Sequence, residues 1–328
     1  MLQPLIACCD LGGTKMLVGL VSLDGDMLAT EKYLIGSRMK PDEVIDDLDA
    51  ALNRLLIQMG AERTAIAAFG CSTPGVINVK TGMIAMNHNV GWVDVPFRDL
   101  LRERFGVPVA LEMDANAAAL GEYWKGAAQG LKSFAFVIVG TGIGAGIVLN
   151  CQPLHGAHGV AGEIGHTVLI PNGPLCGCGK HGCLEALSSG LSIARKANAA
   201  LTLGRATSLR DRNTPLSAKD VVEAARGGDA LAREIIDEAG YYLGIGLANF
   251  ITLFDPEAII LGGGLGWGAY DLLHPALQRG LQQHLNYWSA RAMPILPSTV
   301  GDDFAGLLGA AHAAFTQLSQ ANSSEAGT

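Results

Sequence analysis

The sequence has no apolar run approaching the ~20 residues that a membrane helix requires, and charged residues make up only 16% of its 328 positions. It also has no cluster of lysine and arginine, and its 23 basic and 31 acidic residues give a net charge of −8. This charge disfavours a broad grip on a nucleic acid backbone, so neither a nucleic acid nor a membrane is expected as a partner. Residues Met1–Pro4 lack the basic start of a signal peptide, and we therefore expect a cytoplasmic protein.

A disulfide framework is also poorly supported by the sequence. The seven cysteines are an odd number spread over a long chain, and three of them crowd between Cys176 and Cys183, which favours metal binding. Hydrophobic residues make up 49% of the chain, enough for sizeable cores, and the length is that of about two domains. The 43 glycines gather in short loops after apolar runs, where we expect the backbone to approach a ligand closely.

Short apolar strands alternate with amphipathic helices, which predicts an α/β protein. The expected strands are Leu5–Cys9, Met16–Leu23, Met27–Tyr33, Ala65–Cys71, Val107–Met113, Phe134–Val139, Ile147–Asn150 and Ala258–Leu261. The expected helices are Pro41–Met59, Phe97–Arg104, Ala115–Gly126, Leu184–Leu201, Ala218–Arg226, Ala230–Phe254 and approximately Asp303–Leu318. Because a strand, a glycine-rich tip and a second strand occur in succession twice, the chain is expected to contain two related halves.

The two glycine-rich tips are candidate phosphate-binding loops. Asp10–Lys15 and Gly140–Gly146 offer bare backbone N–H groups and a threonine hydroxyl, the donors that surround phosphate oxygens. The alternative for each is a tight hairpin that needs glycine for its backbone conformation. Neither loop is a Walker motif or a dinucleotide fingerprint. Together with a third glycine loop at Gly262–Gly264, they fit a nucleotide held between two lobes.

Four residues of the zinc-binding type follow the second loop. One imidazole and three thiols are spaced along the chain at His166, Cys176, Cys178 and Cys183. Four such ligands fill a tetrahedron, so the predicted zinc site is closed and structural. The alternative is a group of free buried cysteines.

Asp114 follows the predicted strand Val107–Met113 directly, at the carboxyl edge where open α/β sheets place their ligands. A carboxylate there can take the proton from an attacking hydroxyl, or it can be an ordinary helix N-cap. Glu163 and Glu185 flank the proposed zinc site and, with His166, could hydrogen-bond the hydroxyls of a sugar. Their alternative roles are solvated loop charges or support of the metal site.

Taken together, these segments resemble the ROK family of bacterial sugar kinases and sugar-responsive repressors. The resemblance runs from Ile6 to about Phe315 and keeps the order of the motifs throughout. It is carried by Asp10-Leu11-Gly12-Gly13-Thr14-Lys15, Asp114-Ala115-Asn116-Ala117-Ala118, Gly140–Gly146, Gly162-Glu163-Ile164-Gly165-His166, Cys176-Gly177-Cys178-Gly179, Gly182-Cys183-Leu184-Glu185 and Leu261-Gly262-Gly263-Gly264.

The resemblance implies a two-lobed, actin- and hexokinase-like (ribonuclease H-like) ATPase fold that binds ATP and sugar in the cleft between its lobes. Residues 1–113 would form a small lobe on which helix 303–318 packs back, and residues 114–302 a large lobe carrying the zinc knuckle at 163–185. A homodimer is also implied.

The resemblance further implies the roles of individual residues in an ATP-dependent sugar kinase. Asp114 matches the catalytic base that deprotonates the C6 hydroxyl of a hexose. Sugar hydroxyls would be held by Asn89, Asp114, Glu163, His166 and Glu185, with His166 serving zinc and sugar through different ring nitrogens. ATP with Mg²⁺ would be held by Asp10, Gly12, Gly13, Thr14, Lys15, Gly140, Thr141, Gly142, Gly144, Gly262, Gly263 and Gly264.

One residue departs from the family pattern, because Met113 stands where the family usually has an asparagine that reaches a sugar hydroxyl. A thioether cannot replace that hydrogen bond, and an unpaired buried hydroxyl costs ~1–3 kcal/mol. We expect glucose as the substrate, with N-acetylmannosamine, N-acetylglucosamine or fructose as alternatives.

Two other functional classes are possible for this family. One is a sugar-sensing transcriptional regulator without kinase activity, which would carry a DNA-binding helix-turn-helix ahead of the first strand; here the glycine hairpin starts within the first ten residues. The other is a catalytically silent sugar-binding protein, which the presence of both phosphate loops and Asp114 disfavours.

Overall fold

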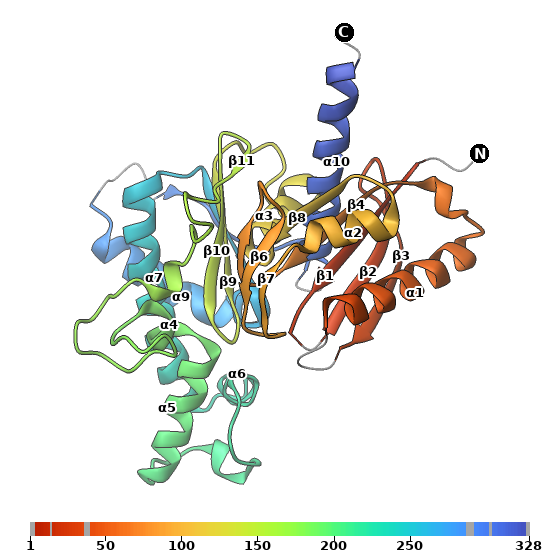
Figure 1. Ribbon diagram of the computed structural model, residues 1–328. Coiled ribbons are helices and arrows are strands. Elements are labelled where there is room, and N and C mark those ends of the chain that lie inside the picture. Colours follow the sequence, from red (N-terminus) through yellow and green to blue (C-terminus); the bar gives the residue numbers. More distant parts are fainter. Residues whose placement is uncertain (1–3, 14, 36–39, 287–291, 302–303, 326–328) are drawn as a thin grey trace. The chain divides into compact units, whose positions relative to one another are not determined.

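The computed structural model of the chain describes residues 4–13, 15–35, 40–286, 292–301 and 304–325, with side chains described to residue 321 (Figure 1). Its strands are β1 (Leu5–Leu11), β2 (Lys15–Ser22), β3 (Met27–Leu34), β4 (Ile66–Thr73), β5 (Val76–Asn78), β6 (Met83–Asn87), β7 (Trp92–Val95), β8 (Val109–Met113), β9 (Phe134–Val139), β10 (Ile143–Leu149), β11 (Gln152–Pro153), β12 (Ala258–Gly262) and β13 (Ile295–Pro297). Its α-helices are α1 (Pro41–Met59), α2 (Phe97–Phe105), α3 (Asp114–Lys125), α4 (Leu184–Ser188), α5 (Gly190–Thr202), α6 (Ala218–Arg226), α7 (Ala230–Phe254), α8 (Gly263–Gly266), α9 (Tyr270–His284) and α10 (Ala305–Glu325). Within the described part of the chain, no helix is both long and apolar enough to cross a membrane.

The chain divides into two compact units. Unit 1 comprises Met1–Lys132, Gly146–Ala161 and Thr299–Thr328, and unit 2 comprises Ser133–Ala145 and Gly162–Ser298. This division differs from the predicted lobe boundary after Met113, because α3 packs against α10 and so groups with the N-terminal strands. The two units are described separately below.

The main sheet of unit 1 has the strand order β3-β2-β1-β4-β8. The first three strands along the chain pair antiparallel, whereas β1 pairs with β4 and β4 with β8 in parallel. Parallel neighbours end at the same edge, so the carboxyl ends of β1, β4 and β8 lie side by side. This edge carries the candidate residues of unit 1.

The second large sheet repeats this arrangement, with the order β11-β10-β9-β12-β13. Strand β12 pairs in parallel with both β9 and β13, as β4 does with β1 and β8. The α/β class and the two related halves expected from the sequence are therefore confirmed. The strand predicted at Ile147–Asn150 begins earlier, at Ile143, because the glycines at 144 and 146 continue as strand residues.

A third, smaller sheet of order β5-β6-β7 lies in a segment for which no strand was expected. Its strands are three, five and four residues long, too short for a clear alternation of apolar and polar residues. Residues Asn87 and Trp92, which end β6 and begin β7, pair directly across this sheet.

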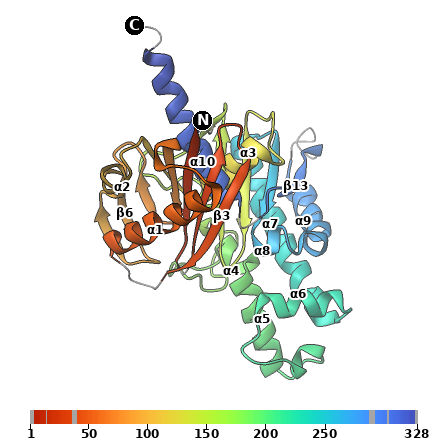
Figure 2. The same ribbon diagram turned by 90° about the vertical axis from the view of Figure 1, so that its right-hand side faces the viewer.

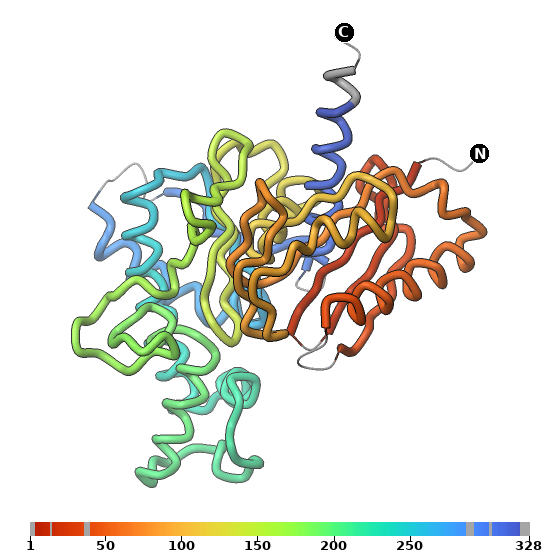
Figure 3. Tube along the Cα trace, viewed as in Figure 1, coloured from red at the N-terminus to blue at the C-terminus, as the bar shows by residue number. Residues whose placement is uncertain are grey.

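Alternate residues of β1 face two hydrophobic cores. Leu5, Ala7 and Cys9 pack with buried residues of α1 and α2, whereas Ile6 and Cys8 pack with the C-terminal helix α10. This follows from the two-residue period of a strand, which sends successive side chains to opposite faces of the sheet. Strand β1 and helix α10, which are far apart in the sequence, thus lie side by side, as the red strand and blue helix of Figure 3 show.

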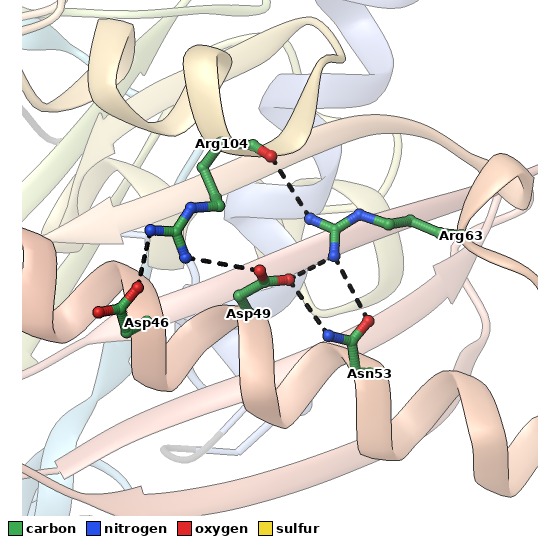
Figure 4. Close-up of polar contacts among 5 residues, drawn as sticks. All are labelled: Asp46, Asp49, Asn53, Arg63 and Arg104. Atoms are coloured by element: carbon green, nitrogen blue, oxygen red, sulfur yellow. Dashed lines mark hydrogen bonds and ion pairs between the residues drawn. The ribbon is translucent and has the colours of Figure 1, made fainter.

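An ion-pair cluster joins α1 to the segments that follow it (Figure 4). Arg104 of α2 pairs with Asp46 at 2.7 Å, and its other nitrogen lies 3.5 Å from Asp49. Arg63 pairs with Asp49 from the second side and donates to the Arg104 carbonyl at 3.5 Å. Exposed pairs of this kind contribute less than ~1 kcal/mol each, so the buried faces of α1 and α2 hold these helices in place.

In unit 2, the long helix α7 packs against α9 with very short backbone separation (Figure 2). A Cβ on Gly244 would lie 2.1 Å from the Leu277 carbonyl, and one on Gly280 would lie 2.2 Å from that of Tyr241. Helix α9 was not predicted. The helix predicted at Leu184–Leu201 is two helices, since the Ser189 hydroxyl accepts the Ser192 N–H and caps the start of α5.

Glycine also sets the distance between α10 and its neighbours in unit 1. A Cβ on Gly309 would lie 1.5 Å from the carbonyl oxygen of Ala117 in α3, and one on Gly70 of β4 would lie 1.9 Å from that of Ala310. Since these neighbours are backbone atoms, they cannot move aside as a flexible side chain could. The helix pair must separate to admit even one methyl group.

We therefore predict that Gly309→Ala destabilises the protein by about 1–3 kcal/mol or more, despite the better helix propensity of alanine. Urea unfolding measures the effect. Gln320→Ala, on an exposed position of the same helix, is the control and should stay within about 0.5 kcal/mol of the parent. Equal stability of the two variants would show that α10 and α3 are not held at this distance.

Candidate functional site

The carboxyl edge of the unit 1 sheet gathers polar residues from three neighbouring strands. Asp10 near the end of β1 is in register with Ser72 of β4, and Thr73 of β4 is in register with Met113 of β8. The Ser72 hydroxyl donates a hydrogen bond to the Asp10 carboxylate. Asp114 begins the next helix, α3, directly after β8. Open α/β sheets bind ligands at this edge.

The first glycine loop turns tightly at this edge and lies against Asn89. The Gly12 N–H donates to the Lys15 carbonyl at 2.9 Å, closing the turn between β1 and β2. A Cβ on Gly13 would lie 2.9 Å from the Asn89 Cβ, so a larger residue at 13 would displace the asparagine. The predicted loop residue Thr14 lies outside the described residues. Among the predicted residues, the structure thus brings Gly13 and Asn89 together.

Asn87 fixes the turn that carries Asn89, and the sequence analysis assigned it no role. Its buried side chain donates to the Thr73 hydroxyl at 3.1 Å, and its Oδ1 accepts the Asn89 N–H at 3.0 Å. Ser72 and Thr73 were likewise assigned no role. For these two residues, the signal was a polar residue at the end of a buried strand.

Asp114 is the first residue of α3, and the N-cap position belongs to Met113, which makes no side-chain cap. The alternative of an ordinary N-cap is therefore not what the structure shows. The Asp114 side chain is accessible to solvent, and its Oδ1 accepts the N–H of Ala115 at 2.8 Å. Desolvation by the surrounding protein atoms nevertheless raises its pKa, a shift that the Ala115 hydrogen bond partly offsets.

In unit 2, the second glycine loop lines a cavity of about 860 Å³. Gly140 and Thr141 form one part of its wall, and α5, α6 and the segment around Gly264 form the rest. The loop is held by α5, whose Gly190 N–H donates to the Gly140 carbonyl at 2.8 Å. Gly263 has a φ of +83°, and a Cβ there would lie 2.6 Å from the Val139 carbonyl oxygen. The second and third glycine loops thus meet at one cavity large enough for a nucleotide base and ribose.

The four predicted zinc ligands lie together in unit 2. One ligand atom from each of His166, Cys176, Cys178 and Cys183 lies within 4.8 Å of all the others. The Sγ atoms of Cys178 and Cys183 are 3.7 Å apart, and the Cys176 Sγ is 3.7 Å from the His166 Nδ1. A zinc tetrahedron with bonds of about 2.3 Å to sulfur and 2.0 Å to nitrogen has edges of about 3.6–3.8 Å. The four residues therefore fit a zinc ion.

The glycines around these ligands make the required turns. The Gly179 N–H donates to the Cys176 carbonyl at 3.0 Å, and Gly179 has a φ of +84°. Gly182 has a φ of +72°, and a Cβ on it would lie 1.6 Å from the Ile170 carbonyl oxygen. Only glycine adopts both the conformation and the contact at position 182.

Glu185 connects this cluster to the second glycine loop. Its Oε2 accepts the Ile143 N–H at 3.0 Å, and its Oε1 lies 3.6 Å from the Cys176 Sγ. A Cβ on Gly142 would lie 2.4 Å from the same Oε2. The imidazole of His166 presents Nδ1 to the cysteines and Nε2 toward Glu163, whose Oε2 is 3.9 Å away. One ring nitrogen thus faces the cluster, and the other faces an exposed carboxylate.

The duplicated sheets, with a glycine loop after the first strand of each, define the actin-like ATPase class of fold. Residues 6–317 match the model of the ROK family, and the chain belongs to this family. A glucokinase from Halalkalibacterium halodurans is 37% identical over 313 residues, which cover 92% of each chain.

Two solved structures are informative neighbours. A ROK family glucokinase from Streptomyces griseus, in complex with glucose and AMPPNP, is 34% identical and superposes with a TM-score of 0.76, covering 95% of this chain and 99% of that one. A ROK family transcriptional regulator, a homologue of the E. coli MLC protein, is 27% identical with a TM-score of 0.87, covering 97% of this chain and 79% of that one. The fold is therefore shared by kinases and regulators, and the site residues must distinguish them.

Proposed function

We propose that the protein is an ATP-dependent glucokinase that transfers the γ-phosphoryl group of ATP to the C6 hydroxyl of glucose. The observation that carries this proposal is Asp114, an accessible carboxylate at the carboxyl edge of parallel strands that does not cap its helix. As the hydroxyl oxygen bonds to phosphorus, Asp114 would accept its proton, and ADP would leave with the electrons of the broken P–O bond. Similarity to glucokinases over most of the chain supports the same reaction.

The environment of Asp114 suits a general base. A raised pKa increases its affinity for a proton in the transition state. The backbone N–H groups at the start of α3, including that of Ala115, also stabilise negative charge at this position. Both effects would be absent from an aspartate in an ordinary surface loop.

The cavity of unit 2 is the proposed site of the adenosine part of ATP. Gly140, Thr141 and Gly264 line it. Gly142 lies just before β10 and Gly144 at its start, and Gly262 and Gly263 lie where β12 passes into α8. Bare backbone N–H groups in such loops can surround phosphate oxygens. In unit 1, Gly12, Gly13 and Lys15 would contact the phosphates, and the Asp10 carboxylate is the type of ligand that Mg²⁺ prefers. Bound Mg²⁺ would neutralise charge on the phosphates.

Glucose hydroxyls would be held by Asn89 and Asp114 of unit 1 and by Glu163, His166 and Glu185 of unit 2. We assign zinc to His166, Cys176, Cys178 and Cys183, where it would fix the imidazole through Nδ1 and leave Nε2 for the sugar. N-acetylmannosamine, N-acetylglucosamine and fructose remain alternative acceptors. The homodimer and the cytoplasmic location also remain predictions.

A sugar-sensing regulator is the second candidate, favoured by the TM-score of 0.87 to a ROK regulator. A regulator needs to bind sugar but needs no general base and no nucleotide cavity. Turnover with ATP therefore distinguishes a kinase from a regulator.

The first prediction is that the protein phosphorylates glucose with ATP and that Asp114→Asn lowers kcat by about 10² to 10⁴, with little change in KM. Asparagine keeps the size and one hydrogen bond but cannot accept the proton. The measurement is coupled ADP release over glucose, fructose, mannose and the two N-acetylhexosamines.

A thermal melt is the control for this variant. The pKa of Asp114 is raised in the folded state. Above both the folded-state and the unfolded-state pKa, its charged form therefore destabilises the folded protein, so Asp114→Asn should leave Tm unchanged or higher. A folded variant with more than about a tenth of the parent turnover would exclude Asp114 as the base. No turnover with any sugar, combined with sugar binding by calorimetry, would favour the regulator.

The second prediction tests the nucleotide cavity through Gly264. A Cβ there meets no atom within 4 Å, so Gly264→Val should fold normally while its side chain enters the cavity. We expect KM for ATP to rise about 10-fold or more, with KM for glucose within about twofold. Gly264→Ala should give a smaller rise in the same direction. An unchanged KM for ATP in both variants would place the nucleotide elsewhere.

The third prediction is that the purified protein holds about one zinc per chain and that Cys178→Ser releases it. Cys178 is the exposed thiol of the cluster, so the substitution removes a ligand without disturbing a core. Elemental analysis measures the metal, and Cys151→Ser, which removes a cysteine outside the cluster, is the control. Chelator-free protein without metal would contradict this assignment.

A further inference from the structure

Glu112 is a buried carboxylate at the end of β8, two residues before Asp114. Only 5% of the residue is exposed. Its Oε1 accepts the backbone N–H of Met113 at 2.9 Å and the side-chain amide of Asn116 at 3.3 Å. Glu112 therefore bonds to the chain on both sides of Asp114, at the junction where β8 becomes α3.

The other partner of Glu112 is His155, which follows β11. Its Nε2 lies 3.0 Å from Oε1 and 2.9 Å from Oε2, so the ring faces both oxygens of the carboxylate. The hydrogen bond with Glu112 raises the pKa of His155 above its ordinary value, although partial burial opposes the shift. The imidazolium form is thus the one that this contact favours.

Among the described residues, three other titratable side chains line the cavity beside this pair. His155 and Glu112 line a cavity of about 320 Å³ in unit 1, together with Arg98 of α2, Cys151 beside β11, and His312 of α10. Burial lowers the pKa of His312 to about 4, which keeps it neutral at the pH of an assay. Arg98 donates to the Val79 carbonyl at 3.1 Å. Of the lining residues that the structure describes, His155 is the one whose pKa is raised by a hydrogen bond to Glu112.

We propose that Glu112 and His155 form a positioning pair that holds the β8–α3 junction and thereby aims Asp114 at the attacking hydroxyl. The proposal rests on the proposed kinase function. A buried carboxylate that anchors Met113 and Asn116 needs a counter-charge of its own, since an uncompensated charge in such a place is costly. His155 supplies that charge from outside the junction. Phosphoryl transfer depends chiefly on positioning, so a small shift of the junction affects turnover more than binding.

The first test compares His155→Ala with His155→Arg. Alanine removes the counter-charge, and we expect kcat to fall about 10- to 100-fold with KM for glucose and ATP within about twofold. Arginine keeps a positive charge beside Glu112, and the adjoining cavity has room for the longer side chain, so it should restore kcat to within about threefold. His158→Gln, at an exposed histidine on the same segment, is the matched control. His155→Gln serves as the second variant should alanine fold poorly.

The pH profile provides a readout that a purely structural contact would not move. The imidazolium is present below the raised pKa of His155 and is lost as pH rises through it, so kcat of the parent should decline on the alkaline side. His155→Arg keeps its charge and should lose that decline. Folded alanine and glutamine variants with the kcat and pH profile of the parent would overturn the proposal.

The backbone amide of Met113 gives a readout of the Glu112–His155 pair that does not depend on catalytic turnover. In protein labelled with ¹⁵N-methionine, the Met113 amide signal should shift with the titration of His155 and stay constant in His155→Arg. An inactive parent that still shows this shift would refute the kinase function but retain the coupling at the junction. An active parent whose Met113 signal ignores the titration would refute the positioning pair alone.

Discussion

Unit 1 depends on the close packing of α10 against α3 and β4, where backbone atoms of neighbouring elements meet directly. Gly309 and Gly70 allow carbonyl groups of Ala117 and Ala310 to lie where a Cβ would otherwise be. A Cβ on Gly146 would similarly lie 2.0 Å from the Ala115 carbonyl oxygen, at the first turn of α3. The start of α3 is thus confined by backbone atoms that cannot adapt. A general base placed there has little freedom to move, which is the condition that positioning catalysis requires.

In unit 2, the segment 163–185 is held together in a different way. Its knuckle is poor in buried apolar side chains, and the pattern of glycine turns brings one imidazole and three thiols together. A bound metal ion would hold this segment together, as a hydrophobic core does in unit 1. Glu185 links this segment to the second glycine loop, because it accepts the Ile143 N–H and lies beside Cys176. Loss of a bound metal would therefore affect the second glycine loop as well as His166.

The parts of the fold that sequence predicted best are those with a strong local period. Helix α1 begins at Pro41 and ends at Met59 as expected, since seven apolar positions spaced three and four apart fix both its face and its length. Helix α9 was missed because Pro275 lies inside it and its glycine-rich approach resembles a loop. The short sheet β5-β6-β7 was missed because its strands of three, five and four residues are too short for a clear alternation of apolar and polar residues. Among the site residues, the grouping of His166, Cys176, Cys178 and Cys183 was predictable from spacing, whereas the contacts of Asn87, Glu112 and His155 depend on tertiary packing.

Met113 shows how this packing bears on the choice of sugar. Its side chain is buried in the hydrophobic core of unit 1, and its N–H is donated to Glu112. Neither group is available to a sugar hydroxyl, so residue 113 can offer a ligand only its carbonyl oxygen. A hydroxyl that an asparagine would have held must then be recognised by another polar residue or stay hydrated. In the first case the enzyme discriminates at that carbon through side chains elsewhere in the site. In the second it tolerates epimers there, because a hydrated hydroxyl of either configuration costs little.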